Sequence, residues 1–488
     1  MFEAQGADRR CFFCLALLIA GVLLVAGAQP QRAAAGSLIT GIATVEDDPV
    51  AFQHVRDVGA RLVLRPISWA IVAPKQEPRQ WQPADPADPH YEWSEIDAGV
   101  THAIAAGLSP ILQIYGAPQW AQRCHQAGVP AEVPCDPDPA MLAEFAKAAA
   151  KRYSGQFGGL PKVRYWQGLN EPNLSLFFNP QFKDGKPVSP VLYRELINAF
   201  YFAVKSVDSS NLVLAAGLGP IARPRSTVGP MRFARSLLCM TGRQDPRPTA
   251  GKCGGGVYFD IFDIHPYTTG GPTHEGNVDD VQMGDLEKLQ ELIAAADRAG
   301  RIHGRYARTP LWITEFSWDS NPPDPGGVPS RTLTRWAAHA MYRAWSAGVS
   351  RFFWLCLRDN APNPAVSSRE SIEAGLYSRG PSIAEDRPKP VLSAFRFPFV
   401  AFPNGAGFTF WGRTPTSAGG AVAIEVRERG KWLVDSFARA NGNGIFEGTA
   451  VTTYGSNGRG FVRARYQQET AVPFSLQEVK DFYQPPFG

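Results

Sequence analysis

The sequence predicts an α/β protein, a (β/α)8 TIM barrel followed by a small C-terminal antiparallel β-sandwich. Eight short apolar runs between residues 37 and 400 alternate with helical patterns. Strands that alternate with helices imply parallel strands joined by crossovers, and eight such units in about 360 residues suit a closed barrel with enlarged loops. No Gly-rich dinucleotide turn follows the first run, which disfavours the alternative of a doubly wound open sheet.

Each predicted strand is rich in Val, Ile, Leu or aromatic residues and is bounded by Gly, Pro or polar residues. In chain order they are 37–45, 60–66, 109–115, 163–170, 211–217, 259–265, 310–316 and 350–357. Five intervening segments have apolar residues at helical spacing and end near Gly or a polar break, namely 92–107, 139–155, 190–207, 285–300 and 331–348. The segments after the first and fifth strands have weaker helical patterns. The barrel is therefore predicted to occupy residues 37–400.

The composition changes after the barrel, and residues 404–488 are rich in Gly, Thr and Val. Apolar and polar residues alternate in 420–428 and 431–440, and Asn-Gly pairs follow at 441–444 as turn signals. This pattern predicts a β-sandwich accessory domain. No low-complexity linker precedes it, so we expect it to pack on the barrel. Trp411 and Trp432 could stack on sugar, but core positions are the favoured interpretation.

The N-terminus has the pattern of a secretory signal. Arg9 and Arg10 precede an apolar segment at 11–28, which closes on small residues at 26–28. We interpret residues 1–28 as a signal peptide, or as an uncleaved N-terminal anchor because the apolar run is long. The protein is then secreted or sits on the extracytoplasmic cell surface, with membrane contact only if the segment stays uncleaved.

The charge of the chain argues against two classes of partner. There are 49 Lys and Arg against 45 Asp and Glu, a net charge of +4, and no dense basic run. Nucleic acid and acidic membranes are therefore not expected as partners.

Four cysteines bracket two short polar loops that contain Pro and Gly, as is typical of local disulfides in an oxidising compartment. The predicted pairs are Cys124 with Cys135 and Cys239 with Cys253. Cys356 lies inside an apolar run and is predicted to be a buried free thiol.

Two glutamates stand at the ends of predicted strands. Glu171 closes the fourth strand and is followed by Pro172, which prevents further ladder pairing. Glu315 closes the seventh strand. Catalytic groups of such barrels lie at the C-terminal ends of the strands, so both carboxyls should face one cavity. Cleavage of a glycosidic bond needs two such carboxyls, one to protonate the leaving oxygen and one to attack or guide the anomeric carbon.

Other strand ends carry suitable companions. Arg65 could hydrogen-bond an ionised carboxylate, and Asn170 could bind a sugar 2-hydroxyl. His265 and Tyr267 could hold a carboxylate or a sugar hydroxyl, and Trp354 could offer a flat face to a sugar ring.

Two further tryptophans, Trp166 and Trp312, are out of phase with the two glutamates and should face the helices. No metal-ligand spacing such as H-E-x-x-H occurs, so no metal or cofactor is predicted.

The motifs LNEPN at 169–173, HPY at 265–267 and WITEF at 312–316 resemble the retaining glycoside hydrolases of clan A, nearest to families 39 and 5. Residues 91–121 resemble family 39 in particular, and the resemblance covers roughly residues 40–400.

The resemblance implies that Glu171 is the acid/base and Glu315 the nucleophile, that Tyr267 touches the nucleophile, and that Arg65 is the strand-two arginine of the clan. Many relatives place a His at the third strand tip. This chain has QIYGAPQW there, so Tyr115 or Trp120 is expected to serve instead.

The leading hypothesis is a secreted retaining glycoside hydrolase that cleaves O-glycosidic bonds of a poly- or oligosaccharide through a covalent glycosyl-enzyme. It predicts a carboxyl separation of about 5–5.5 Å, whereas about 7 Å or more would indicate inversion. The alternatives are a transglycosylase of the same fold and a non-catalytic carbohydrate-binding or surface protein. The sugar and the linkage stay open.

Overall fold

A computed structural model describes residues 36–125, 130, 133–223, 226–250, 253, 255–268, 270–361, 372–405, 407–452, 454 and 458–477. The predicted signal segment, residues 1–28, lies outside these ranges. Across the ranges that are described, no helix combines the length and the hydrophobicity needed to cross a membrane.

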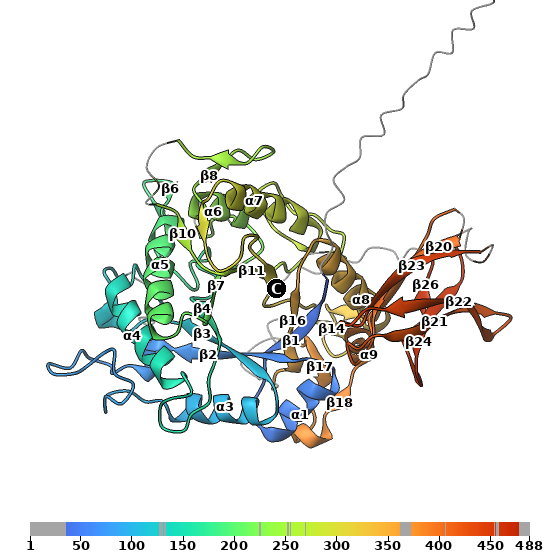
Figure 1. Cartoon of the computed structure of the whole chain (residues 1–488), viewed down its shortest axis with the longest axis horizontal. Helices are drawn as coiled ribbons and strands as arrows, with labels where there is room; N and C mark the ends of the chain where they lie inside the picture. The colour runs from blue at the N-terminus through green and yellow to red at the C-terminus, as the bar shows by residue number, and fades with distance from the viewer. Residues whose placement is uncertain are drawn as a thin grey trace, which may run out of the picture. The chain divides into compact units, whose positions relative to one another are not determined.

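Within the described residues, eight parallel strands close into a barrel (Figure 1). They are β1 (Ile39–Thr44), β2 (Leu62–Ser68), β3 (Ser109–Tyr115), β4 (Tyr165–Gly168), β7 (Leu212–Leu218), β11 (Ile261–Ile264), β13 (Leu311–Ile313) and β16 (Arg351–Arg358). The ring closes because β16 pairs in parallel with β1, with Ile39 opposite Arg351. Each barrel strand lies within one of the eight apolar runs or extends it by one or two residues, so the predicted barrel is confirmed.

Helices surround the strands (Figure 1). The helices of the described residues are α1 (Pro49–Asp57), α2 (Trp69–Val72), α3 (Ser94–Ala105), α4 (Pro139–Arg152), α5 (Ser189–Val207), α6 (Pro230–Leu237), α7 (Leu286–Arg298), α8 (Ser330–Ser346) and α9 (Pro390–Arg396). The weak helical patterns after the first and fifth strands do form helices, α1 and α6. In α1 the Asp48 carboxylate accepts hydrogen bonds from the amides of Val50 and Ala51, and Pro49 occupies the first turn.

Short strands form small two-stranded sheets in the loops, and two more extend the barrel sheet at one side. These are β5 (Phe182–Lys183), β6 (Lys186–Pro187), β8 (Met240–Thr241), β9 (Arg247–Pro248), β10 (Val257–Tyr258), β12 (Ile302–His303), β14 (Ser320–Asn321), β15 (Val328–Pro329), β17 (Gly375–Ser378) and β18 (Arg387–Pro388). β17 and β18 continue the barrel sheet beyond β16.

Apolar side chains fill the barrel interior. They are Ala43, Leu62, Leu64, Ile111, Leu212, Leu214, Ile261, Trp312, Phe353 and Leu355. Gly41 makes room for one of them, because a Cβ at this position would lie 2.4 Å from the Phe353 ring.

The two tryptophans of the strands face opposite sides. Trp166 belongs to the layer between strands and helices, as predicted. Trp312 does not, because its ring packs inside the barrel against Tyr165, with 5.4 Å between the ring centroids. The prediction for Trp312 was wrong because alternation was counted back from Glu315, whereas β13 ends at Ile313 and the pleat does not continue to Glu315.

The C-terminal residues form two antiparallel sheets, which fit the predicted β-sandwich. One contains β19 (Phe399–Pro403), β20 (Gly407–Arg413) and β23 (Ile445–Val451). The other contains β21 (Gly420–Glu428), β22 (Lys431–Ala440), β24 (Phe461–Tyr466), β25 (Glu469–Thr470) and β26 (Phe474–Ser475). The first strand, β19, begins before the predicted boundary at 404. Its apolar residues were assigned to the barrel because their partners in β20 lie beyond that boundary.

One buried arginine contributes to the docking of the C-terminal sheets on the barrel. Arg413 in β20 is fully buried, and its Nη1 donates to the Leu38 carbonyl at 2.9 Å and to Thr40 Oγ1 at 3.1 Å. Its Nη2 donates to the Phe395 carbonyl at 3.2 Å. Burial lowers the pKa of Arg413 to about 10, and the charge of Arg61 acts in the same direction.

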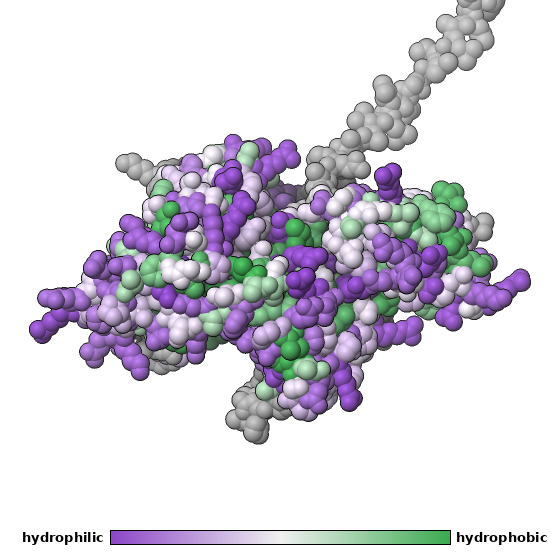
Figure 2. Space-filling view, turned by 60° about the horizontal axis from the view of Figure 1, so that its bottom comes forward, coloured by the Kyte–Doolittle hydropathy of each residue, from purple (hydrophilic) through white to green (hydrophobic). Residues whose placement is uncertain are grey.

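Both tryptophans of this region have packing contacts. Trp411 is buried against Tyr342 and Trp345 of α8, with ring centroids 5.7 and 5.4 Å away. The Arg463 guanidinium lies over the ring of Trp432 at 4.2 Å. Hydrophobic residues are visible at the right-hand end in Figure 2, and the exposed apolar residues of these sheets include Leu433, Val434, Phe437 and Val451.

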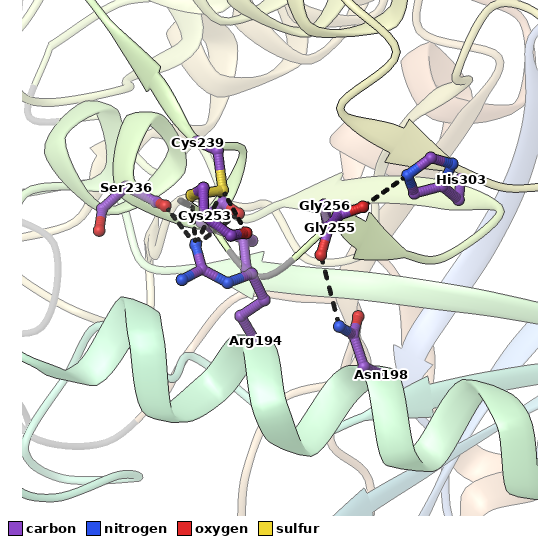
Figure 3. The surroundings of a disulfide bond; sticks show 9 residues. Arg194, Asn198, Ser236, Cys239, Cys253, Gly255, Gly256 and His303 are labelled. Atoms are coloured by element: carbon purple, nitrogen blue, oxygen red, sulfur yellow. Dashed lines mark hydrogen bonds between the residues drawn. A yellow bond between two sulfur atoms is a disulfide. The ribbon is translucent and has the colours of Figure 1, made fainter. Parts of the chain in front are cut away.

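Both predicted disulfides are present. Cys124 is bonded to Cys135, and Cys239 to Cys253. Arg194 on α5 supports the second one, since its Nη1 donates to the Ser236 carbonyl at 2.9 Å and lies 3.1 Å from the Cys239 sulfur (Figure 3). Cys356 is a buried free thiol, as predicted.

Replacing Arg413 tests the docking contact. We expect Arg413→Met to lower the free energy of unfolding by about 2–4 kcal/mol, because the Leu38 and Phe395 carbonyls lose a charged donor while buried. Urea unfolding followed by circular dichroism measures the change. Arg427→Ala, at an exposed position of β21, is the control and should stay within about 0.5 kcal/mol. Equal effects of the two substitutions would contradict the docking role.

Candidate active site

Glu171 lies just beyond the end of β4, in backbone that has left the pleated geometry. Leu169 and Glu171 both have positive φ, 66° and 39°. Such values are uncommon for residues with a side chain and are held in place by surrounding contacts. The Glu171 amide donates to the Gly217 carbonyl at 3.1 Å, which ties this turn to the end of β7.

Two buried amide side chains anchor the segment that follows. Asn173 Oδ1 accepts from the Gly219 amide at 2.8 Å, and its Nδ2 donates to the Gly219 and Val228 carbonyls, each at 3.1 Å. Gln181 Nε2 donates to the Pro172 carbonyl at 2.9 Å. Neither Asn173 nor Gln181 was predicted from the sequence as a site residue. Asn173 stands inside the motif that identified Glu171, so its position was the available signal.

The two carboxylates meet at one imidazole nitrogen. His265 Nδ1 lies 2.9 Å from Glu171 Oε1 and 3.6 Å from Glu315 Oε2. The Tyr267 hydroxyl donates to Glu315 Oε2 at 3.1 Å, so the expected contact with this carboxylate is present. The Glu171 and Glu315 side chains keep 9% and 17% of their surface exposed, which leaves both within reach of a bound molecule.

Burial and charge oppose each other at this cluster. Burial favours the neutral form of His265, but the negative charges of Glu315 and Glu171 outweigh it and raise the pKa of His265 to about 9. Burial also raises the pKa of Glu315, and the neighbouring Glu171 adds to this, while His265 and Tyr267 lower it. At neutral pH the site therefore holds a cation between two acids.

A cleft of about 980 Å³ opens beside Glu315. Its lining includes Gln113 and Tyr115 from β3 and Arg65 from β2. Tyr115, which is 37% exposed, is thus available at the third strand tip. A separate cavity of about 720 Å³ lies between α8, α9 and the C-terminal sheets, but none of the predicted site residues lines it.

Asn170 lies at the tip of β4 beside Glu171 and is half-buried. Its Oδ1 accepts from Gln113 Nε2 at 3.0 Å, which orients the amide. Gln113 is a polar residue inside an apolar strand, and this pattern was the signal that could have pointed to it.

Arg65 does not hold Glu315. Its Nη1 donates to the Val45 carbonyl at 3.0 Å, and its guanidinium lies over the Phe52 ring at 5.7 Å. The expectation fails because Leu64 points into the barrel, and the next residue on a strand points to the other face. Burial lowers the pKa of Arg65, partly offset by the charge of Asp47.

Two predicted site tryptophans, Trp354 as a sugar platform and Trp120 as a residue of the third strand tip, have packing contacts in the structure. Trp354 is fully buried, and its Nε1 donates to the Ala374 carbonyl at 2.6 Å. It belongs to the layer between strands and helices, because Phe353, its neighbour on β16, fills the barrel interior. Trp120 donates from Nε1 to the Pro74 carbonyl at 2.8 Å and packs edge-on against Trp81.

Within the described residues, no group of three or more His, Cys, Asp or Glu side chains is arranged so that it could hold a metal ion.

Comparison with known proteins relates the chain to others through its fold. No protein-family model and no curated protein matches the sequence. Among solved structures, a family 39 glycoside hydrolase from Bacteroides cellulosilyticus WH2 superposes with a TM-score of 0.52 at 17% identity, over 84% of this chain and 78% of that one. A monomeric β-xylosidase from Caulobacter crescentus CB15 gives 0.50 at 15% identity, over 81% and 84%. The fold is thus that of clan A glycoside hydrolases.

The charge of the two carboxylates can be tested through His265. Removing the Glu315 charge with Glu315→Gln should lower the pKa of His265, because the imidazolium loses a counter-charge 3.6 Å away. The measurement is an NMR titration of the imidazole resonances. Glu195→Gln, which removes an exposed carboxylate on α5, serves as the control and should leave the pKa of His265 in place. An unchanged or higher value in Glu315→Gln would refute the described electrostatics.

Proposed function

We propose that this chain is a secreted retaining glycoside hydrolase, which cleaves O-glycosidic bonds of a poly- or oligosaccharide by double displacement. Glu171 is the acid/base and Glu315 the nucleophile. The observation that carries the proposal is the pair of carboxylates held on one imidazole nitrogen beside an open cleft.

The spacing of the carboxylates supports retention. Glu171 Oε1 and Glu315 Oε2 can be no farther apart than their 2.9 Å and 3.6 Å contacts to His265 Nδ1 laid end to end. This places them at or below the lower limit of the roughly 6.5–9.5 Å found in inverting enzymes, and it is compatible with the about 5–5.5 Å of retaining ones.

In the first step a Glu315 oxygen attacks the anomeric carbon as the bond to the leaving oxygen breaks. Glu171 gives its proton to that oxygen, so an alcohol or a shorter glycan leaves. The Tyr267 hydroxyl and the His265 imidazolium keep Glu315 ionised until it attacks. The result is a glycosyl ester on Glu315.

In the second step Glu171, now a carboxylate, takes a proton from water while the water oxygen attacks the anomeric carbon. The ester bond breaks, and Glu315 leaves with the electron pair. Two inversions at the same carbon give net retention. Asn170, whose amide is oriented by Gln113, is placed to bind the sugar 2-hydroxyl in both steps.

Two further observations support the remaining parts of the proposal. The shared fold with clan A enzymes supports glycoside cleavage. The two disulfides are typical of a protein that folds in an oxidising compartment, which supports secretion.

Substitution of each carboxylate tests the roles. Glu171→Gln should lower kcat/KM on polysaccharide or aryl β-glycosides by about 10²–10⁴-fold, the usual value of general acid–base catalysis, and Glu315→Gln by at least as much. Azide should restore turnover of Glu171→Ala with a product of retained configuration, since the anion attacks the glycosyl-enzyme without needing a base. Glu195→Gln is the matched control and should behave as wild type.

The same assay separates the alternatives. A transglycosylase would show the same losses but transfer the sugar to an acceptor alcohol in preference to water. A carbohydrate-binding protein would release no product from any substrate, while still binding glycans. That last outcome would end the proposal.

The charge of the cleft narrows the substrate class. Four acidic side chains line it within the described residues, namely Asp47, Glu92, Glu95 and Glu315, against one base, Arg65. Since four acids outnumber the single charged guanidinium of Arg65, the net charge of the cleft lining is negative. Such a cleft suits neutral sugars or sugars that carry amino groups and disfavours uronic acids.

Matched substrates test this preference. We expect a neutral aryl β-glycoside to be cleaved with at least about tenfold higher kcat/KM than its counterpart with a carboxylate at C6, because each like-charge contact costs on the order of 1 kcal/mol. The double variant Glu92→Gln, Glu95→Gln should narrow the gap. Equal or faster cleavage of the carboxylated sugar would show that the acids do not set specificity.

A further inference from the structure

A chain of buried polar groups continues below the two carboxylates. Asp263 and His265 alternate on β11 and just beyond it, so they share one face, and Thr314 follows the neighbouring strand β13. All three are completely buried. Thr314 Oγ1 lies 2.9 Å from Asp263 Oδ2 and 3.0 Å from His265 Nε2.

The direction of each hydrogen bond in this chain is fixed by chemistry. An ionised carboxylate only accepts, so Asp263 receives the Gly217 amide at Oδ1, 2.9 Å away, and the Thr314 hydroxyl at Oδ2. A hydroxyl has one proton, and Thr314 donates it in the hydrogen bond to Asp263. Its oxygen therefore accepts from His265, which places a proton on Nε2.

The other imidazole nitrogen, Nδ1, faces the two catalytic carboxylates. Whether Nδ1 carries a proton decides the charge of the ring. With Nε2 always protonated, the presence of a proton on Nδ1 makes His265 a cation. The titratable and charged groups around the ring are Glu171 beyond β4, Asp263 on β11, Tyr267 beyond β11 and Glu315 beyond β13. Three of these are acids, so the surroundings favour the charged ring, and Asp263 is the one that takes no part in the chemistry.

The space around these buried polar groups is filled by neighbouring atoms, so their hydrogen-bond geometry cannot relax. Gly217 has a positive φ of 52°, and a Cβ there would lie 2.6 Å from Gln167 Nε2 and 3.2 Å from Asp263 Oδ2. The backbone thus approaches the carboxylate closely enough to donate its amide. Asp263 is fixed both by a backbone donor and by Thr314.

We propose that Asp263 is a positioning residue that acts through Thr314 to hold His265 as a fixed cation, which serves the two catalytic carboxylates in turn. Before the first step the imidazolium balances ionised Glu315. When Glu315 is neutralised as the glycosyl ester, the same Nδ1 proton balances Glu171, which has just given its own proton to the leaving oxygen. No proton leaves His265 in either step. This inference rests on the proposed function for its catalytic consequence.

Burial raises the pKa of Asp263 to about 6, opposed by the charge of His265, the Thr314 hydroxyl and the Gly217 amide. The carboxylate is therefore ionised at neutral pH, as the described hydrogen-bond directions require. Together with the pKa of about 9 for His265, this defines a window between roughly pH 6 and 9 in which the chain is complete.

The test is to remove the charge or the link while keeping the shape. In Asp263→Asn the side-chain amide can donate a hydrogen bond to Thr314 Oγ1. The Thr314 hydroxyl then donates to His265 Nε2, which must be unprotonated to accept, so the neutral ring is favoured. We expect the pKa of His265, measured by NMR titration, to fall by about one unit or more, the usual effect of one nearby charge. Thr314→Val breaks the link with Asp263 intact and should lower it likewise, while Thr314→Ser keeps the hydroxyl and should restore the wild-type value.

The catalytic consequence is read from the pH profile. The alkaline limb of kcat/KM contains the deprotonation of the general acid Glu171 and that of His265. The His265 component should move to lower pH in Asp263→Asn and Thr314→Val, by the same amount as the pKa of His265. A residue with only a structural role would lower the rate at all pH values without moving the limb. Thermal unfolding checks that each variant is folded, and Thr314→Val keeps the test decisive if Asp263→Asn is not.

The two proposals fail in different ways. An unchanged pKa of His265 in both folded variants overturns the role of Asp263, whatever the enzyme cleaves. A lowered pKa in a wild-type protein that cleaves no glycoside would leave the buried chain standing and overturn the proposed function.

Discussion

The site depends on the closure of the barrel. Pairing of β16 with β1 turns eight parallel strands into a ring, so that strand ends far apart in the sequence open onto one rim. Glu171 and Glu315 are 144 positions apart in the numbering, yet both reach His265 Nδ1 because β4, β11 and β13 are held at a fixed stagger. A flat sheet would leave the same side chains in a row, too far apart to act on one bond.

Closure also creates the low-dielectric interior that gives the site its electrostatics. Charges placed there are expensive unless they are matched, and the barrel matches them in alternation from the rim inward. Two acids at the mouth are followed by His265, then by the neutral Thr314 and then by Asp263. Each group has a hydrogen-bond partner in the next one, so groups that would be costly to bury alone are stable when they are buried together.

Much of this could be predicted from sequence, for reasons that are local. The strands could be predicted because an apolar run between Gly, Pro and polar residues is a local pattern that does not depend on distant contacts. The disulfides could be predicted because each pair of cysteines brackets a short loop. The two glutamates were found because polar residues at strand ends are conspicuous. The side of the sheet on which a side chain lies was predicted correctly for Trp166 but not for Trp312, since alternation holds only inside the pleated strand. The early end of β13 broke the count that misplaced Trp312. The predictions for Trp354 and Arg65 rested on their positions near strand ends, without a count of alternating residues. Asp263 and Thr314 were visible as polar residues in apolar strands, but their purpose depends on contacts between neighbouring strands, which no single stretch of sequence contains.

The contact made by Arg413 has a consequence for the order in which the molecule can be completed. This residue bonds the Leu38 carbonyl and Thr40, at the very start of the first barrel strand, and that strand also needs β16 as its neighbour. During synthesis the earliest strand must therefore wait, with one edge open, until β16 has emerged, when residue 358 of 488 has been made. Unpaired strand edges invite aggregation. The edge of β1 is therefore protected only after β16 has paired with it, and the Leu38 carbonyl only after Arg413 has reached it.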